Sequence, residues 1–426
     1  MEKIVIIGAG PAGLLLAHCL LARGGYQVEI YERRPDPRLI VSRSQRTFPI
    51  SLQTRGLNAI RAVPGLETKL AHYGVWSRGA CLHRKRGKPR IVERQTPQLL
   101  IDRNQLVLAL LEALPLKERA EEISIQFDCA CIGVALPQRQ IILAPQAAPQ
   151  VTLSYDRLVA TDGRNSTVRN ALVSQGRMQC EETVVPDAYR ALHLAFTDQE
   201  AAVNLAPNRI HTWNLAKGIR VVAAPQPGNQ LHGVIVFPHD QDPFESLTTA
   251  AAVKAFFAQK SPTLAQLMTL ADAAALLQRP TAQVVTIRCD RLHAGDRVLL
   301  LGDAGHAVSP SLGQGCNSAL QDVQVFAALL DRHRENWAPA LAAFTAERLP
   351  EVHALQELLN YAFPRSTLMM LEFILRLTLG KTLKRWWPKL SKPLPMELIM
   401  DSPLSYTEVL VQTQGWVERV KRSQSS

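Results

Sequence analysis

Residues 3–24 read KIVIIGAGPAGLLLAHCLLARG and decide the fold of the first part of the chain. The apolar, β-branched run at residues 3–7 predicts a strand buried on both faces, and the leucine-rich run that follows predicts a helix. Between them, the first glycine permits a tight turn, the second lets backbone approach a pyrophosphate, and the third lets the helix pack closely on the strand. Phosphate oxygens would meet the free N–H groups and the positive dipole end of the helix. The turn therefore predicts a dinucleotide site formed by Gly8, Gly10, Pro11, Ala12 and Gly13.

A second predicted strand, YQVEIYERR at residues 26–34, ends near Glu32 and Arg33. An acidic side chain at this distance from the glycine turn accepts hydrogen bonds from the hydroxyls of the adenosine ribose. This contact requires a 2′-hydroxyl without a phosphate, so Glu32 favours FAD or NAD over NADP as the bound dinucleotide. The sequence contains a single glycine fingerprint of this kind, which argues against enzymes that hold two dinucleotides.

Two later motifs also place a predicted strand before a glycine-containing turn and a helix. Residues 155–172 read YDRLVATDGRNSTVRNAL, where the strand RLVAT ends at Asp162. Residues 299–323 read LLLGDAGHAVSPSLGQGCNSALQDV, where Asp303 ends the strand and a glycine-rich loop precedes a helix that begins near Gly315. Each junction alone is only a turn signal, and the order of the three motifs carries the information.

This order resembles that of the FAD-dependent aromatic hydroxylases with the p-hydroxybenzoate hydroxylase fold. The resemblance implies that Asp303 accepts a hydrogen bond from a ribityl hydroxyl. It places residues 310–315 beneath the isoalloxazine ring, where small residues let backbone approach a flat ring. Backbone N–H groups of the next helix would face flavin N1 and O2, and His306 would pack or hydrogen-bond behind the loop. The implied cofactor contacts are Asp162, Asp303, Pro310, Gly313, Gly315, Cys316 and Asn317, and the loop candidates beside the reacting ring are Pro310, Gly313, Gln314 and Gly315.

A closer resemblance is to the kynurenine 3-monooxygenase subgroup. It is carried by SRSQRTFPISLQTRGLNAIRAVPGLE at residues 42–67, by LLIDRNQLVLALLEAL at residues 99–114, and by the C-terminal segments RLPEVHALQELLNYAF and SPLSYTEVL. The resemblance implies that Arg46 and Arg103 belong to the FAD site, with Arg103 near the pyrophosphate.

Three positions depart from this subgroup where it binds kynurenine. Ala80 and Arg94 stand where the subgroup has a substrate-binding arginine and tyrosine, and Ala362 stands where it has a substrate-facing asparagine. Without these groups, the amino acid head of kynurenine lacks its partners. We therefore expect a related scaffold with a different substrate.

The resemblance implies a monooxygenase in which NAD(P)H binds transiently and reduces FAD. Reduced flavin reacts with O2 to give a C4a-hydroperoxide that hydroxylates or epoxidises an aromatic or isoprenoid-like small molecule. Two alternatives remain open, an FAD-dependent reductase or desaturase of an isoprenoid and a non-catalytic, FAD-stabilised protein associated with membranes. We expect no metal site and no Ser/His/Asp set.

The length of 426 residues predicts more than one domain. The net charge of +11 favours anionic partners such as a phosphate-bearing cofactor or an acidic membrane surface, and we expect no nucleic acid partner. The expected fold is α/β. It combines a Rossmann-like FAD-binding domain (residues 1–75, 99–175 and 287–345), an inserted, mostly antiparallel β-sheet substrate domain (76–98 and 176–286) and a C-terminal helical region (346–426).

Residues 366–390, STLMMLEFILRLTLGKTLKRWWPKL, are first apolar and then strongly basic. Glu372 and Arg376 interrupt the apolar part and lie four residues apart on one helix face. This pattern suits a helix at a bilayer interface, with its cations against anionic lipid. It equally suits a helix that caps the substrate pocket. We find no secretory signal and no spanning segment, and so expect a cytoplasmic protein, either free or attached peripherally to a membrane.

Overall fold

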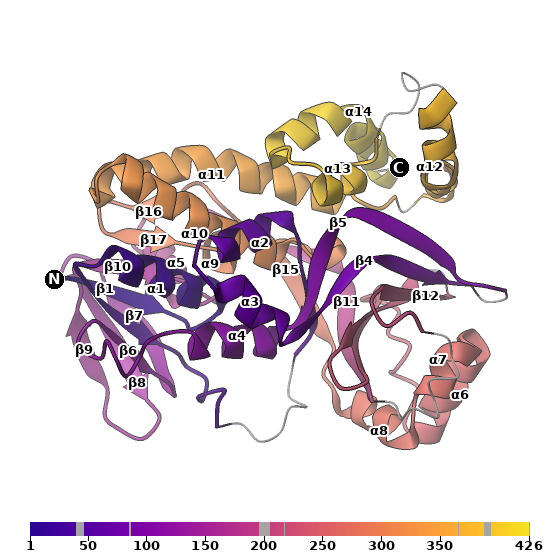
Figure 1. The fold of residues 1–426 in the computed structure, drawn as a ribbon, viewed down its shortest axis with the longest axis horizontal. Coiled ribbons are helices and arrows are strands. Elements are labelled where there is room, and N and C mark those ends of the chain that lie inside the picture. Colours follow the sequence, from indigo (N-terminus) through magenta and orange to yellow (C-terminus); the bar gives the residue numbers. More distant parts are fainter. Residues whose placement is uncertain are drawn as a thin grey trace.

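The computed structural model describes residues 1–39, 47–84, 87–195, 205–216, 218–364, 366–386 and 393–425. Arg46 lies outside these ranges. The described residues form a six-stranded, an eight-stranded and a three-stranded sheet, with helices packed between and around them (Figure 1).

The six-stranded sheet is built around the first strand. β1 (Glu2–Ile7) pairs in parallel with β2 (Tyr26–Tyr31) on one side and with β10 (Arg157–Ala160) on the other. The strand order is β16-β17-β10-β1-β2-β6, and only β16 runs antiparallel to its neighbour. The remaining strands are β6 (Ile123–Gln126), β16 (His293–Ala294) and β17 (Val298–Leu300). Because β1, β10 and β17 are parallel, their carboxyl ends bring the three motifs to one edge of the sheet.

Alternate residues of β1 enter two different cores. Ile4 and Ile6 pack with α1 (Pro11–Arg23), α4 (Arg103–Glu112) and α10 (Gly315–Arg332). Val5 and Ile7 pack with the three-stranded sheet and with α5 (Thr167–Ser174), whose N-terminus Ser166 caps by accepting a hydrogen bond from Arg169 N. A strand buried on both faces is what its unbroken apolar sequence predicts. The strands of the small sheet are β7 (Cys129–Ala135), β8 (Gln140–Pro145) and β9 (Val151–Ser154).

The eight-stranded sheet has the order β15-β11-β14-β13-β12-β4-β5-β3. Every pairing is antiparallel except that of β12 with β4. Residues 209–225 and 230–238, which alternate apolar and polar side chains, contribute β12, β13 and β14. The bounds are β3 (Pro49–Leu52), β4 (Gly74–His83), β5 (Arg90–Asp102), β11 (Cys180–Ala195), β12 (Ile210–Ala216), β13 (Ile219–Gln226), β14 (Gln230–Pro238) and β15 (Ala282–Cys289).

Three helices cover one face of this sheet, α6 (Ala250–Lys260), α7 (Pro262–Leu267) and α8 (Leu270–Gln278). The sequence LAQLMTLADAAALLQR at residues 264–279 reads as one continuous apolar helix, but the structure divides it between α7 and α8. The helix is interrupted at Thr269, because the side chains of Thr269 and Asp272 form a reciprocal capping box at the start of α8.

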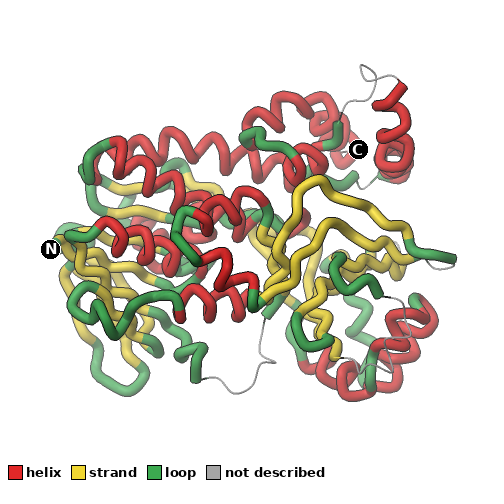
Figure 2. Tube along the Cα trace, viewed as in Figure 1, coloured by secondary structure: helices red, strands yellow, loops and turns green. Residues whose placement is uncertain are grey.

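The C-terminal third is helical. The long helix α11 (Trp337–Asn360) runs along the six-stranded sheet to a group formed by α12 (Thr367–Trp386), α13 (Pro395–Asp401) and α14 (Tyr406–Ser425) (Figure 2). Glu372 of α12 pairs with Arg376 at 2.8 Å, as their spacing predicted, and also with Arg419 of α14 at 2.7 Å. Among the described helices, none combines the length and apolar character needed to cross a bilayer.

Candidate functional site

In the glycine turn after β1, close packing requires glycine at Gly8 and Gly13, whereas Gly10 has room for a larger residue. At Gly8, φ is +102° and a Cβ atom would lie 2.6 Å from Thr161 O. At Gly13, a Cβ atom would lie 2.2 Å from Gly8 O. At Gly10, the nearest such contact is 3.9 Å away. The space beside Gly10, in front of the α1 N-terminus, is where the turn predicts a pyrophosphate.

Glu32 lies directly after β2 and its carboxylate faces the glycine turn. Oε2 accepts a hydrogen bond from Ala9 N at 2.9 Å, and Oε1 accepts one from Arg34 N at 2.9 Å. The turn therefore holds the acid beside the predicted ribose position. Arg33 is exposed.

Asp162 follows β10 on the other side of the same turn. Its Oδ2 accepts a hydrogen bond from Thr167 N at 2.8 Å, at the start of α5. Its Oδ1 is buried and has no hydrogen-bond partner among the described residues. Burial raises the pKa of this carboxyl, against the hydrogen bonds that lower it. A polar ligand group next to Oδ1 would satisfy the unpaired oxygen.

The third motif lies beside the first residue of α4. Asp303 begins the short helix α9 (Asp303–His306), and its side chain is reached by solvent. The protein atoms crowded around it raise its pKa, while the charges of His306 and Arg103 act in the opposite direction. Burial also raises the pKa of Cys316 to about 12, opposed by Arg103. A Cβ atom on Gly315 would lie 3.9 Å from Asp303 Oδ1. The structure thus brings Arg103, Asp303, Gly315 and Cys316 together.

In the loop before α10, Pro310 and Gly313 are exposed and Gln314 is buried. Pro310 begins a 3₁₀ turn that ends at Leu312, and Gly313 follows with φ +65°. Gln314 is fully buried, and its Nε2 donates a hydrogen bond to Gln53 Oε1 at 2.8 Å. Its side chain therefore holds the loop from behind and does not reach the surface around Asp303.

Asn317 anchors the first turn of α10 in the same way. Its Oδ1 accepts from Gln53 N at 2.7 Å, and its Nδ2 donates to Ser51 O at 2.8 Å and to Gly313 O at 3.0 Å. The side-chain amide is fully used within the protein, so any cofactor contact at this position falls to the backbone. No described side chain caps the N-terminus of α10.

Behind the loop lies a buried charged cluster that sequence reasoning missed. Asp322 accepts from Gly302 N at 2.8 Å and from Arg348 Nε at 2.9 Å, and it contacts His306 Nε2 at 2.5 Å. Burial alone would raise the pKa of Asp322, but His306 and Arg348 outweigh it and lower the value. The cluster fixes the backbone just before Asp303, and His306 occupies the supporting position predicted for it. The sequence signal that could have revealed this cluster is Asp322, an acidic residue on the buried face of α10.

One face of β5 leads from the loop toward the C-terminal helices. Arg94, Thr96 and Gln98 alternate on this face. Arg94 and Ser51 both donate to Gln98 Oε1, which joins Arg94 to the strand that anchors Asn317. The Thr96 Oγ1 atom lies 3.5 Å from Oδ1 of Asp401, which belongs to α13.

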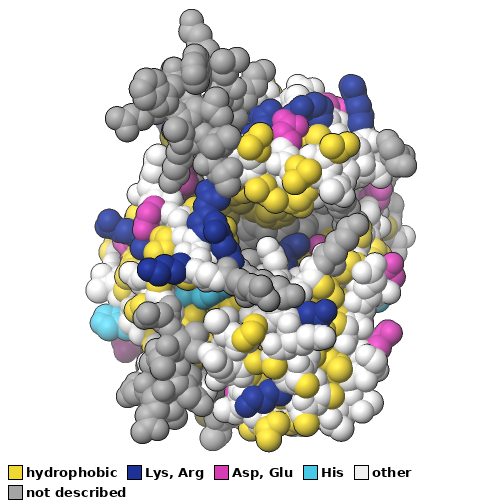
Figure 3. Space-filling view, turned by 90° about the vertical axis from the view of Figure 1, so that its right-hand side faces the viewer, with side chains coloured by type: hydrophobic (Ala, Val, Ile, Leu, Met, Phe, Trp, Pro, Cys, Tyr) yellow, Lys and Arg dark blue, Asp and Glu magenta, His cyan; other side chains and the backbone are white. Residues whose placement is uncertain are grey.

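Arg94 lies in a crowded setting without a paired acid. Burial lowers its pKa, partly offset by Asp401, and in the described part of the chain no carboxylate forms an ion pair with it. Ala80 pairs with Val92 across β4 and β5, whereas Ala362 is buried among the C-terminal helices. Figure 3 shows the face at the right of Figure 1, which is hollowed near its centre, with Lys or Arg side chains in and around the opening.

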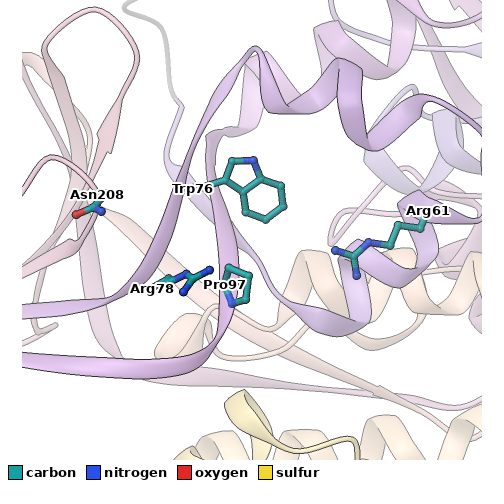
Figure 4. A pocket seen from close by; sticks show the side chains of 5 residues that line it. All are labelled: Arg61, Trp76, Arg78, Pro97 and Asn208. Carbon is teal, nitrogen blue, oxygen red and sulfur yellow. The ribbon is translucent and has the colours of Figure 1, made fainter.

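A separate open pocket of about 420 Å³ lies on the other face of these strands (Figure 4). None of its lining residues belongs to the three motifs. They are Arg61, Trp76, Arg78, Pro97 and Asn208.

Residues 1–358 match the protein family described as "FAD binding domain". The chain is 28% identical over 426 residues to the kynurenine 3-monooxygenase of Sus scrofa, covering 98% of this chain and 88% of that one. It is 30% identical over 422 residues to that of Stenotrophomonas maltophilia, covering 97% and 90%.

Solved structures agree on the fold. The tetrameric form of 2-methyl-3-hydroxypyridine-5-carboxylic acid oxygenase aligns with a TM-score of 0.69 at 20% identity, covering 93% of this chain and 95% of that one. PqsL of P. aeruginosa, in complex with 2-aminobenzoylacetate, aligns with a TM-score of 0.65 at 22% identity, covering 84% and 96%. The resemblance inferred from the three motifs is confirmed, and the chain belongs to the family of FAD-dependent monooxygenases that includes the kynurenine 3-monooxygenases.

Proposed function

We propose that the region around Asp303 where the three motifs and α4 meet holds FAD, and that an aromatic substrate bearing a carboxylate binds beside Arg94. Family membership makes this chain an FAD-dependent enzyme that uses NAD(P)H and O2 to hydroxylate an aromatic substrate. It does not favour the isoprenoid reductase or the non-catalytic alternative. The observation that carries the proposal is the convergence of all three motifs and α4 on one edge of the six-stranded sheet.

Each contact proposed for FAD follows from the atoms available. The α1 N-terminus beside Gly10 receives the pyrophosphate, with Arg103 supplying a positive charge. Glu32 accepts from the ribose, and Asp303 accepts from the ribityl chain. Backbone N–H groups at Gly315 and Cys316 face the ring, where their dipoles stabilise negative charge. Arg46 is proposed from the resemblance alone.

When bound, FAD supplies the oxygen-activating redox chemistry. The protein holds the ring against a loop fixed from behind by Gln314, Asn317 and the Asp322 cluster. It also orients the substrate and keeps water away from it. No described side chain is needed as a nucleophile.

Arg94 is the group proposed to select the substrate. Among the described residues, the Arg94 guanidinium donates to an uncharged amide, which leaves donors for a planar, bidentate anion such as a carboxylate. The Gln98 and Ser51 side chains fix its position relative to α10. Kynurenine is proposed to be a poor substrate because Ala80 cannot replace an arginine and because Arg94 occupies the expected tyrosine position.

The test is NAD(P)H oxidation and O2 uptake by the FAD-loaded protein with matched aromatic acids and their amides. We expect acids to accelerate flavin reduction and to yield hydroxylated product, and kynurenine to yield little or none. Equal stimulation by acids and amides would remove the role of Arg94, whereas the absence of product from any aromatic compound would remove the proposed function. Formation of 3-hydroxykynurenine in step with NADPH oxidation would refute the kynurenine prediction.

We further propose that α12 attaches the protein peripherally to anionic membranes. Phe373, 5% exposed, packs against Trp416 of α14. The opposite face presents Leu368, Leu371 and Leu375, which are 82%, 60% and 56% exposed. A helix that served only as an internal cap would bury these leucines. Apolar residues with this spacing suit the headgroup boundary of a bilayer.

A further inference from the structure

A second cluster of reactive side chains lies where two halves of the eight-stranded sheet meet. β4 and β12 are joined over only four residue pairs, residues 80–83 with 210–213, and this is the sheet's parallel pairing. Cys81 and His83 of β4 and His211 of β12 share a face, because alternate and paired residues point the same way. The Cys81 Sγ and one ring nitrogen of each histidine all lie within 4.8 Å of one another.

The hydrogen bonds of His211 fix which nitrogen is free to bind. Its Nε2 lies 3.0 Å from Ala206 O, and its Nδ1 lies 2.9 Å from His83 Nε2. Because a carbonyl only accepts, the proton belongs on Nε2 and the lone pair of Nδ1 points into the cluster. Metal-binding histidines are commonly oriented by such a bond from the other ring nitrogen.

The spacing is close to that of a tetrahedral ion. Two nitrogens bound to Zn²⁺ at the usual bond length lie about 3.3 Å apart, against the 2.9 Å between His83 and His211. The His83 ring is held by stacking on Trp213, with centroids 4.3 Å apart and planes 8° from parallel. Small side-chain rotations therefore suffice to bring the donors to bonding distance.

Two of the three side chains in this cluster are fully buried and the third is half-buried. Cys81 and His211 are 2% and 1% exposed, and His83 is half-buried, which leaves a route from solvent. The nearby charge of Arg209 is balanced by Glu93 at 2.7 Å.

We propose that Cys81, His83 and His211 bind one Zn²⁺ ion that clips the two halves of the sheet together. One thiolate and two imidazoles form a donor set that suits zinc, with water as the fourth ligand. Binding releases the Cys81 thiol proton to solvent, so affinity rises with pH. The inference is independent of the flavin site.

The test uses the FAD-loaded protein, equilibrated with ZnCl2, dialysed against metal-free buffer and analysed by mass spectrometry for zinc. We expect one ion per chain and a raised melting temperature. Cys81→Ser and His211→Gln should lose both the zinc ion and the rise in melting temperature. The glutamine in His211→Gln keeps an N–H that can donate to Ala206 O. Cys131→Ser, on the three-stranded sheet, should keep both. Equal zinc retention by wild type and the two ligand variants, or no retention by wild type, would overturn the site.

A second measurement covers the case in which a variant fails to fold. Co²⁺ replaces zinc in such sites, and a tetrahedral thiolate-bound Co²⁺ absorbs at longer wavelengths than flavin. Wild-type protein should develop these bands in proportion to added Co²⁺, and excess Zn²⁺ should remove them. A spectrum that shows only octahedral, aqueous Co²⁺ would overturn the proposal without any variant.

Discussion

Tyr406 donates a hydrogen bond to Gln314 Oε1 at 3.0 Å, which joins the last helix of the chain to the loop before α10. Arg55 also contacts Tyr406, because its guanidinium lies 4.1 Å from the centroid of the Tyr406 ring. The same guanidinium donates a hydrogen bond to Ile399 O at 2.8 Å. Gln314 in turn bonds Gln53. The C-terminal helices, the loop and α2 (Thr54–Arg61) therefore form one hydrogen-bonded unit.

Tyr406→Phe is predicted to destabilise the protein by about 1–3 kcal/mol, because it leaves the buried Gln314 oxygen unpaired. Thermal or urea unfolding of the FAD-loaded protein measures the change. Tyr361→Phe is the matched control, since its ring also packs in the C-terminal cluster. Equal effects of the two substitutions would show that the bond to Gln314 contributes nothing particular.

Asp303→Ala is predicted to weaken FAD binding about tenfold or more, since a buried ribityl hydroxyl would lose its acceptor at roughly 1–3 kcal/mol. The fold should survive, because the Asp322 cluster holds the adjacent backbone. Titration of apoprotein with FAD, followed by flavin fluorescence, gives the dissociation constant. The exposed Asp240→Ala serves as control, and an unchanged constant in Asp303→Ala would exclude Asp303 from the site.

Arg94→Met is predicted to abolish the preference for aromatic acids over their amides. Hydrogen bonds to a charged group contribute about 1.5–3 kcal/mol, so the acid should bind roughly ten- to a hundredfold more weakly while the amide changes little. Arg78→Met, in the pocket of Figure 4, is the control. Binding is read from the flavin absorbance shift. A variant that still prefers acids would assign carboxylate recognition elsewhere.

Acid should destabilise the protein through His193. Its ring stacks on His232 at 4.3 Å, and His232 contacts Asp102 at 2.8 Å. Burial, with the charges of His232 and Arg279, lowers the pKa of His193 from 6.5 to about 4, against the pull of Asp102. The unfolded chain therefore binds the extra proton, and stability falls as pH drops from 6.5 toward 4.

His193→Gln is predicted to remove this pH-dependent loss, which amounts to at most ~3 kcal/mol. Urea unfolding across this pH range, compared with wild type, isolates the contribution. A glutamine N–H can still reach Thr47 O, which His193 Nε2 contacts at 3.1 Å. Parallel pH profiles for the two proteins would show that His193 does not titrate as described.

Full-length protein is predicted to sediment with anionic liposomes at low salt, and added salt should weaken the attachment without abolishing it. The double substitution Leu368→Ser and Leu371→Ser should reduce binding by removing apolar burial. Val411→Ser, at an exposed position on α14, is the control. The basic residues at positions 381–389 lie outside the described side chains. Wild-type protein that stays in the supernatant would dismiss the membrane proposal.

Short-range chemistry explains why the motifs could be predicted from sequence. The glycine turn is fixed by sterics among residues within and beside it, and Ser166 caps α5 within a few positions. The interruption between α7 and α8 also has a local cause, the capping box at Thr269. It is hard to predict because the sequence is apolar on both sides of Thr269. Hydrophobic periodicity reports which face is buried and does not report where a helix is interrupted.

Long-range partners explain what sequence could not supply. Gln314 reads as a flavin-loop residue because its neighbours are glycines, and its burial depends on Gln53 and Tyr406 from distant parts of the chain. Asp322 and Arg348 come from different helices, and neither helix reveals the pairing by its own pattern. The zinc candidate likewise depends on the register between β4 and β12.

The order of the strands also governs how the chain is made. β1 finds its β10 partner only when residues near Arg157 have left the ribosome, and β10 finds β17 only when Val298 has. Until then the nascent chain carries an unpaired strand edge beside a half-built nucleotide site, and such edges recruit other chains. A translation product that stops before Val298 is therefore expected to be colourless and to aggregate, whereas one that includes Tyr406 has every described residue of the proposed FAD site.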